Sequence, residues 1–401
     1  MIPPTRATRA SSDPGGSRVA ANHYDVVIAG ARCAGASTGM LLARAGLNVL
    51  LVDPLPRGTD TLSTHALMRG AVLQLCRWGL LDAVRARGTP PIATTTFHYG
   101  DEAIRIEIKP GDGVDALYAP RRTVLDAILV DAACAAGAEV VHGLSVSALT
   151  RDGSGRVRGV QLTDSARDVT DVSTDLVIGA DGVRSKVARL LGAEVSTQTP
   201  HTAASVYGYW KGLPNDGNHW YYDTGVSIGT IPTNERATCV FAAVSSADFH
   251  SNRSKGLEVV HRGALERVDP GLASRVDRGE RTGKLRAFAG IPGFLRRSTG
   301  PGWALVGDAG YFKDPITAHG ITDALRDAEL LSRAVVRGGA KTLAEYEATR
   351  NRLSRGLLDT TDRIASFEWD LEEVKDLHLR LSREMKTEVE RILEFDSEPQ
   401  P

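Results

Sequence analysis

The sequence predicts an α/β fold in which a domain with a parallel sheet is joined to a mostly antiparallel β-sheet domain and to C-terminal helices. Three observations predict it. Short, continuously apolar strands alternate with helical segments from residue 23 to residue 191, which is typical of a buried parallel sheet. Short strands with many aromatic residues follow over 202–243, and helical periodicity dominates after Gly320.

Composition narrows the classes of protein that need to be considered. A chain of 401 residues with 42% apolar and 24% charged residues can bury a sizeable core in about two domains. Because Lys and Arg total 48 against 49 Asp and Glu, the chain lacks the basic excess expected of a nucleic-acid-binding protein. No run of 18 apolar residues predicts a membrane span. Four widely spaced cysteines predict neither a metal site nor a disulfide framework, so a cytoplasmic location is expected.

The elements follow from the N-terminus. Residues 1–22 are rich in Ser, Pro, Gly and Arg and lack the apolar segment of a secretory signal, so they predict a disordered tail. An apolar strand over 24–30, a helix over 34–45 ending near Gly46 and a second strand over 47–53 predict a right-handed parallel unit. The remaining segments up to the C-terminus are helices over 66–79, 80–86 and 121–136, a hairpin over 94–108, strands over 140–141, 146–149, 157–162, 175–181 and 303–308, and the aromatic strands.

A glycine-rich turn lies between the first strand and its helix. Gly30-Ala31-Arg32-Cys33-Ala34-Gly35 matches Gly-x-Gly-x-x-Gly at its first and third glycines, with Arg32 in place of the second. Such a turn directs free backbone N–H groups and a positive helix end at a pyrophosphate. Asp53 ends the second strand, where an acid accepts from a ribose hydroxyl. The sequence therefore predicts a Rossmann-like dinucleotide-binding domain, although an ordinary glycine-rich turn remains an alternative, and Arg32 either contacts phosphate or points to solvent.

Two further motifs specify the dinucleotide. Asp181-Gly182 ends the strand over 175–181, and Gly307-Asp308 ends the strand over 303–308, ahead of Pro315 and Gly320. With the glycine turn, these motifs over residues 23–340 resemble the FAD-dependent monooxygenases of the aromatic-hydroxylase superfamily. Arg122, at a helix start, resembles that family's flavin-contacting arginine. Turn aspartates are common, so Asp181 and Asp308 also have a purely structural interpretation.

The resemblance implies roles and domain boundaries. Asp308 would accept from the ribityl hydroxyls of FAD, and the helix that begins at Gly320 and Ile321 would direct its N-terminus at the flavin pyrimidine edge. Cys33, Ala34 and Val146 complete the implied cofactor contacts. The implied segments are an FAD-binding domain over 23–92, 117–200 and 284–340, a substrate-binding β-sheet domain over 93–116 and 201–283, and C-terminal helices over 341–395.

Three flavin chemistries share this scaffold. Flavin halogenases resemble one another in a Trp-x-Trp-x-Ile-Pro motif and an early lysine, but here Ser227 and Gly229 stand at the tryptophan positions and Lys109 is the first lysine. The segment 315–321 resembles flavin-dependent double-bond reductases of the geranylgeranyl type, whose aromatic pair is also missing at those two positions. The favoured reading is hydroxylation of an aromatic, phenolic or similarly electron-rich molecule by NADH or NADPH and O₂ through a flavin hydroperoxide. A non-catalytic FAD-binding partner protein is a further alternative.

Candidate substrate-side residues come from segments expected to face the flavin. His65 and His319 are predicted catalytic bases or flavin contacts, although the hydroxyl side chains over 61–64 could simply cap a helix. Tyr209, Trp220 and Tyr222 are predicted to stack on a ring substrate, with ordinary core packing as the alternative. The apolar stripe of the C-terminal helices predicts packing or a dimer face, so the protein is expected to be a monomer or a homodimer. The charged residues after 370 are predicted to face solvent.

Overall fold

The first sheet of the computed structural model, which describes residues 19–395, is built on the predicted strand–helix–strand unit. Strand β1 (His23–Ala29) is parallel to β2 (Val49–Asp53), and α1 (Cys33–Arg44) connects them. Parallel pairing continues through β8 and β18 on one side and β5 on the other, in the order β17-β18-β8-β1-β2-β5. The other strands of this sheet are β5 (Glu139–His142), β6 (Ser145–Arg151), β7 (Val157–Thr163), β8 (Val169–Gly179), β17 (Thr299–Gly300) and β18 (Trp303–Leu305).

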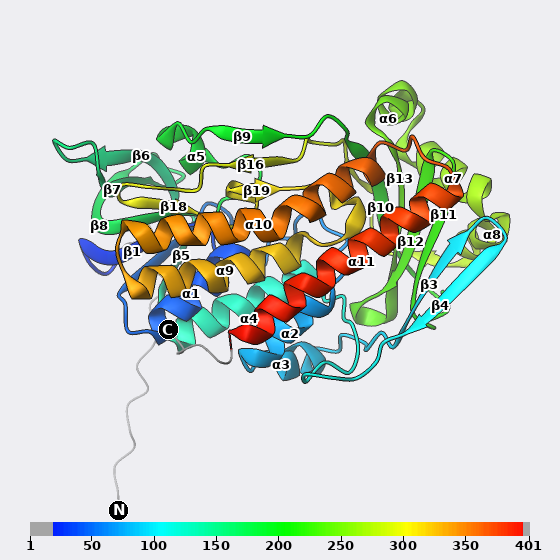
Figure 1. Cartoon of the computed structure of the whole chain (residues 1–401), viewed down its shortest axis with the longest axis horizontal. Coiled ribbons are helices and arrows are strands. Elements are labelled where there is room, and N and C mark those ends of the chain that lie inside the picture. The colour runs from blue at the N-terminus through cyan, green and yellow to red at the C-terminus, as the bar shows by residue number, and fades with distance from the viewer. Residues whose placement is uncertain (1–18, 396–401) are drawn as a thin grey trace, which may run out of the picture.

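Alternating side chains of β1 divide the core of this domain into two layers. Val26 and Ile28 pack with the helices α1, α4 and α9, whereas Val27 and Ala29 pack with β6, β7 and α5. This alternation follows from the two-residue period of a strand. Figure 1 shows the helices crossing in front of the sheet, with α10 and α9 lying side by side. Their bounds are α4 (Arg122–Ala135), α5 (Lys186–Leu191), α9 (Gly320–Arg337) and α10 (Ala340–Ala365).

The second sheet confirms the predicted antiparallel domain. Its order is β14-β10-β13-β12-β11-β3-β4, with β15 also on β10, and all its pairs are antiparallel except that of β11 with β3. The sheet continues past the boundary predicted at residue 283, because β15 pairs with β10. Its strands are β3 (Thr94–Tyr99), β4 (Glu102–Glu107), β10 (Ala203–Lys211), β11 (Asn218–Asp223), β12 (Val226–Pro232), β13 (Ala237–Ser245), β14 (Glu280–Arg281) and β15 (Arg286–Phe288).

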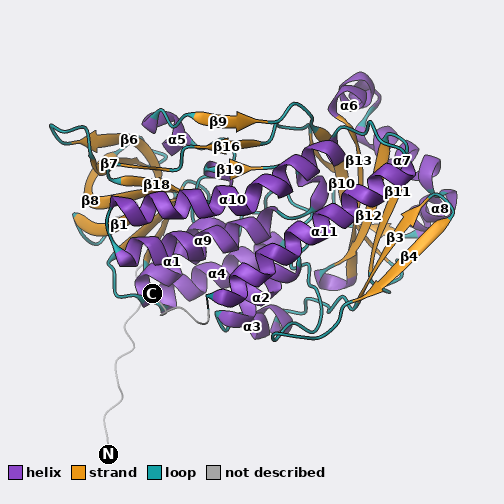
Figure 2. Cartoon of the chain, viewed as in Figure 1, coloured by secondary structure: helices purple, strands orange, loops and turns teal. Residues whose placement is uncertain are grey.

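The two faces of the second sheet have different neighbours. Trp210 and Tyr221 pack with α7 and α8, two helices that the strand pattern did not predict. Tyr209, Trp220 and Tyr222 point the other way, into the core that they share with the first domain. Figure 2 shows this sheet at one end of the molecule with the long C-terminal helix α11 reaching it. The bounds of these helices are α6 (Ser246–Asn252), α7 (Leu257–Val268), α8 (Pro270–Arg278) and α11 (Leu371–Glu394).

Smaller elements connect the two domains. A three-stranded sheet has the order β19-β16-β9, and helices α2 and α3 follow the loop after β2. Two short 3-10 turns, η3 and η4, lead into α9. The bounds are α2 (Arg69–Arg77), α3 (Leu81–Ala86), β9 (Val195–Gln198), β16 (Phe294–Arg296), β19 (Tyr311–Phe312), η1 (Asn234–Arg236), η2 (Arg253–Lys255), η3 (Gly307–Ala309) and η4 (Pro315–Thr317).

The ends of the described segment correct one expectation. Most of the predicted tail lies outside the described residues, but 19–22 are placed, and the amide of Ala20 donates to Glu139 Oε1 at 2.8 Å. Ordered chain therefore begins before the predicted position 23. The four cysteines all lie in the described part and are free thiols. Within residues 19–395, no helix combines the length and apolar character needed to cross a bilayer.

Candidate functional site

The glycine turn after β1 fits the backbone of its neighbours so closely that side chains are excluded. Gly30 has φ of 105°, and a Cβ atom there would lie 2.4 Å from the carbonyl oxygen of Ala180. A Cβ atom at Gly35 would lie 1.8 Å from the oxygen of Gly30. No side chain caps the N-terminus of α1, whose first residues are Cys33 and Ala34. The amide groups of this first turn are therefore left for an anionic ligand, as the sequence predicts.

Asp53 fixes the turn from the end of β2. One carboxylate oxygen accepts from the amide of Ala31 at 3.0 Å and the other from the amide of Leu55 at 2.9 Å. Beside it lies a shallow open hollow, lined in part by Arg32, Asp53, Asp126 and His142. Arg32 Nη1 is buried there without a hydrogen-bond acceptor and lies 3.9 Å from Asp126 Oδ2. Arg32 thus borders the hollow and has a donor available for a phosphate.

Arg122 connects the glycine turn to the second half of the site. Its guanidinium donates twice to Asp126, one turn along α4, at 3.0 and 3.1 Å. The thiol of Cys33 donates to the same carboxylate at 3.2 Å, and burial raises the pKa of this thiol. Asp308 lies close enough to Arg122 for their charges to interact. The structure therefore brings together Cys33, Arg122 and Asp308, which come from three separate segments.

Asp308 and the N-terminus of α9 both lack side-chain hydrogen-bond partners within residues 19–395. Gly307 has φ of 59°, and a Cβ atom there would lie 2.8 Å from that of Ala34. Asp308 is half-buried and has no hydrogen-bond partner among residues 19–395; burial raises its pKa to about 6 although Lys313 and Arg122 oppose this. Gly320 and Pro315 are exposed, whereas Ile321 is buried. Within the described part of the chain, no side chain caps α9, so its N-terminus is open to a ligand.

Two predicted cofactor contacts have other partners. The carboxylate of Asp181 accepts from the amides of Lys186 and Val187 at 2.7 and 3.1 Å and from the hydroxyl of Ser185. Asp181 therefore caps α5, as the structural alternative supposed. The Val146 side chain is buried in the apolar layer behind the sheet. These placements favour structural roles for both side chains.

His65 and Tyr209, predicted separately, form one hydrogen-bonded unit. His65 Nδ1 lies 3.1 Å from the carbonyl oxygen of Ala119, and Nε2 lies 3.2 Å from the Tyr209 hydroxyl. Because the carbonyl can only accept, Nδ1 carries the proton and Tyr209 donates to Nε2. Burial, assisted by the charge of Arg121, lowers the pKa of His65 to about 3. His65 is therefore neutral at pH 7 and orients the Tyr209 hydroxyl.

The other predicted aromatics continue the same sheet face. Trp220 packs on Phe241 with ring centroids 5.5 Å apart, and Tyr222 lies opposite Ser227 in the register of β11 and β12. A Cβ atom at Gly229 would lie 2.1 Å from the Phe241 ring, so this ring fills the space of the missing motif tryptophan. We call this face the aromatic wall, comprising Tyr207, Tyr209, Trp220, Tyr222 and Phe241.

The C-terminal helix α11 closes the far end of the aromatic wall. His378 contacts Tyr222 with ring centroids 4.4 Å apart and lies 2.9 Å from the Tyr99 hydroxyl through Nδ1. Burial lowers the pKa of His378 to about 4. Sequence reasoning missed this histidine because nothing local indicates that a C-terminal helix reaches the second domain.

His319 lies in a buried ionic network that sequence reasoning also missed. Its Nε2 is 2.6 Å from Glu388 Oε2 on α11, and burial lowers the pKa of His319. Arg326 Nη1 lies 2.7 Å from the other oxygen of Glu388, and Lys313 pairs with Asp323. This arrangement favours a structural role for His319, and it shows that Glu388, predicted to face solvent, is buried. We call Lys313, His319, Asp323, Arg326, Asp327 and Glu388 the α9 network.

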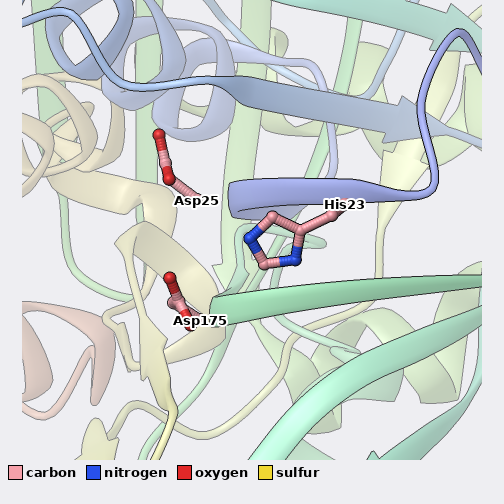
Figure 3. Close-up of side chains that lie close together, drawn as sticks. All are labelled: His23, Asp25 and Asp175. Atoms are coloured by element: carbon pink, nitrogen blue, oxygen red, sulfur yellow. The ribbon is translucent and has the colours of Figure 1, made fainter.

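A separate group of His23, Asp25 and Asp175 lies on the inner strands β1 and β8 (Figure 3). His23 and Asp25 are at the start of β1, whereas the cofactor-side residues follow the strand ends. Asp25 accepts from the amide of Asn48 at 2.7 Å, and Asp175 lies 3.7 Å from Arg158. The chain itself thus supplies partners for both carboxylates, and we assign no ion to this group.

Comparisons with known proteins agree with this geometry. The family described as "FAD binding domain" matches residues 23–361. The chain is 28% identical over 341 residues to a menaquinone reductase of Mycolicibacterium smegmatis, covering 79% of this chain and 77% of the relative. It is 26% identical over 342 residues to a digeranylgeranylglycerophospholipid reductase of Methanothrix thermoacetophila, covering 80% and 82%.

Solved structures share the fold. PqsL of Pseudomonas aeruginosa, described as a probable FAD-dependent monooxygenase, is 22% identical with a TM-score of 0.74, covering 91% of this chain and all of that one. The flavin-dependent brominase Bmp2 is 20% identical with a TM-score of 0.74, covering 92% and 94%. At these identities the likeness shows a common architecture.

Proposed function

Since the chain belongs to the FAD-binding domain family of oxidoreductases, we propose that it is a cytoplasmic monooxygenase that hydroxylates an aromatic, electron-rich small molecule with NADH or NADPH and O₂. The observation that carries this proposal is the position of the aromatic wall. Five ring side chains from three strands face the domain that holds the open α9 terminus and Asp308. Such a surface suits a flat, apolar ligand next to a flavin.

The residues present fit FAD. The uncapped turn of α1 and Arg32 would hold its pyrophosphate, Asp53 its adenosine ribose and Asp308 its ribityl chain. The open N-terminus of α9 would face the pyrimidine edge, where it favours negative charge. Bound FAD would supply the redox chemistry with O₂, which no side chain can supply.

The protein's own contribution is positioning and proton handling. The aromatic wall would hold the substrate ring and exclude water. Tyr209 donates its proton to the neutral His65, so its hydroxyl oxygen keeps lone pairs that can accept from a substrate hydroxyl. His65 is then a positioning residue for Tyr209 rather than a free base.

The test is oxygen incorporation by the purified yellow protein. Incubation with NADPH or NADH, ¹⁸O₂ and a panel of phenols and aminoaryl compounds should give a product that gains one labelled oxygen. The substrate should also accelerate nicotinamide oxidation. A flavin that neither nicotinamide reduces, across this panel, would instead support a non-catalytic FAD-binding protein.

A second candidate function is favoured by the sequence relatives named above, which are reductases. For this candidate the substrate would be an isoprenoid carrying a double bond, and no O₂ would be consumed. Product formation from a menaquinone or a geranylgeranyl lipid under strict anaerobiosis would favour the reductase. Loss of all turnover without O₂ would favour the monooxygenase.

A further inference from the structure

Two arginines share one carboxylate beside the aromatic wall. Asp60 comes from the loop after β2, Arg121 directly precedes α4, and Arg286 lies on β15. Asp60 Oδ2 lies 3.1 Å from Arg121 Nη2 and 2.9 Å from Arg286 Nη1. We call these three residues the arginine pair cluster. Three segments distant in the sequence are thus joined at the junction of the two domains.

The cluster carries an uncompensated positive charge. Two guanidinium groups are always ionised at neutral pH, and Asp60 offsets only one of them. Asp126, on the adjacent helix α4, is engaged by Arg122 and by Cys33. The arginine side chains retain partial exposure, 20% for Arg121 and 36% for Arg286, so a ligand can reach them.

Arg121 also has a buried donor without a partner. Its Nε has no hydrogen-bond acceptor among the described residues 19–395, although an unpaired buried donor is normally avoided. The guanidinium is held in place, because its carbon lies 3.7 Å from the centre of the Tyr209 ring. The backbone amide of Arg121 also donates to Asn234 at 2.9 Å. A donor group fixed in this way is prepared for an acceptor that the chain does not provide.

The cluster borders the proposed substrate site. Tyr207 and Arg286 are direct neighbours in the pairing of β10 with β15, and the Tyr207 hydroxyl accepts from the amide of Ser63 at 3.0 Å. Tyr209, on which Arg121 stacks, belongs to the same sheet face. A ring held on the aromatic wall could therefore extend an acidic substituent toward both guanidinium groups.

We propose that Arg121 and Arg286 form a binding site for an oxyanion, a carboxylate or a phosphate, at the edge of the aromatic wall. The inference deepens the proposed function and rests on it for the source of the anion. A carboxylate would come from an aromatic acid substrate, and a phosphate from NADPH. Paired guanidinium donors match the geometry of both anions.

The test is calorimetric titration of the FAD-loaded protein with pairs of probes that differ by one anionic group. Benzoate is compared with benzamide, and adenosine 2′,5′-bisphosphate with AMP. We expect at least one charged probe to bind at least tenfold tighter than its matched control. Arg286→Gln should remove that preference while FAD content stays the same. If Arg286→Gln weakens the binding of benzoate, the site binds a substrate carboxylate. If Arg286→Gln weakens the binding of the bisphosphate, the site binds the phosphate of NADPH.

A control and a charge variant separate binding from folding. Arg262→Gln removes a surface arginine of α7 that also pairs with two carboxylates, and it should leave both titrations unchanged. Asp60→Asn removes the internal competitor of the anion, so the sensitive probe should bind several-fold tighter. A purely structural cluster predicts weaker or equal binding in Asp60→Asn, and that result would overturn the proposal. So would equal binding of each anionic probe and its matched control. Because oxygen incorporation is measured separately, this failure is distinguishable from failure of the proposed function.

Discussion

The α9 network and the arginine pair cluster both contain arginines and carboxylates, yet they are built differently. In the α9 network, Arg326 is fully buried and contacts Asp323, Asp327 and Glu388 at 3.2, 2.7 and 2.7 Å. In the arginine pair cluster, cations outnumber the acid, and part of each side chain remains accessible. The difference suggests that charges balanced within the chain maintain the architecture, whereas excess positive charge at an accessible position is suited to binding an anionic ligand.

The α9 network attaches the C-terminal helix to the side of the molecule where we propose that FAD binds. The carboxylate of Glu388 on α11 accepts hydrogen bonds from His319, just before α9, and from Arg326 within α9. Burial would raise the pKa of Glu388, but His319 and Arg326 lower it to about 2. The carboxylate is therefore charged at neutral pH, and the guanidinium of Arg326 is one of the cations that compensate it.

The strongest test of the contrast is the same substitution in both places. Arg326→Gln leaves buried carboxylates uncompensated, so it should lower the free energy of unfolding by about 3–5 kcal/mol. Arg286→Gln removes a partly exposed partner and should change it by less than about 1 kcal/mol. Urea unfolding of both variants measures the difference. Similar losses in the two variants would show that the clusters do not differ in kind.

Asp308 extends the comparison between charges paired within the chain and charges available to a ligand, because its carboxylate has no hydrogen-bond partner among residues 19–395. Asp308→Asn should weaken FAD binding roughly 10- to 100-fold, the effect of about 1.4–3 kcal/mol lost from a hydrogen bond to a charged acceptor. The matched variant Asp181→Asn should retain FAD and instead lose about 1 kcal/mol of stability through the cap of α5. Flavin titration of each apoprotein gives the affinities. Stoichiometric FAD tightly held by Asp308→Asn would contradict the site assignment.

Neutral buried histidines make a third, pH-dependent test. Burial lowers the pKa of His65 to about 3 and that of His261 to about 4, below the usual 6.5. The unfolded chain therefore binds more protons below pH 6.5, and stability falls as pH drops from 6.5 toward 4. Each group contributes up to about 1.4 kcal/mol per pH unit. His261 is remote from both clusters. Between pH 7.5 and 5.5, the free energy of unfolding of His261→Gln, measured in urea, should fall by roughly 1 kcal/mol less than that of the wild type. An unchanged pH dependence would contradict a neutral His261.

The sequence specified the parts of the site that depend on local backbone geometry. Gly30, Gly35 and Asp53 were predictable because a tight turn between a strand and a helix limits which residues fit. Glu388 was predicted to face solvent, which was wrong, because its burial depends on α11 returning to α9. Arg286 was not identified either, since its role follows from the pairing of β15 with β10. Long-range packing of this kind leaves no local pattern.

The smallest expected effect concerns Ala318, which lies between the α9 network and the proposed flavin site. Ala318 has φ of 51°, a left-handed conformation that costs a residue with a side chain about 1–2 kcal/mol. Ala318→Gly should relieve that strain. The greater freedom of glycine in the unfolded chain opposes this gain in stability by about 0.5–1 kcal/mol.

A net gain of about 0.5 kcal/mol is therefore expected for Ala318→Gly, with FAD affinity unchanged because neither cluster is altered. Urea unfolding, run beside the control Ala45→Gly at the end of α1, measures this gain. The control has φ of −80°, so it should lose stability instead. If both variants lose stability alike, the left-handed residue is not strained. The segment between Lys313 and Gly320 would then be held without backbone strain by its packing and by hydrogen bonds such as that from the amide of Ala203 to Asp314. The α9 network would not need to oppose strain to fix the start of α9.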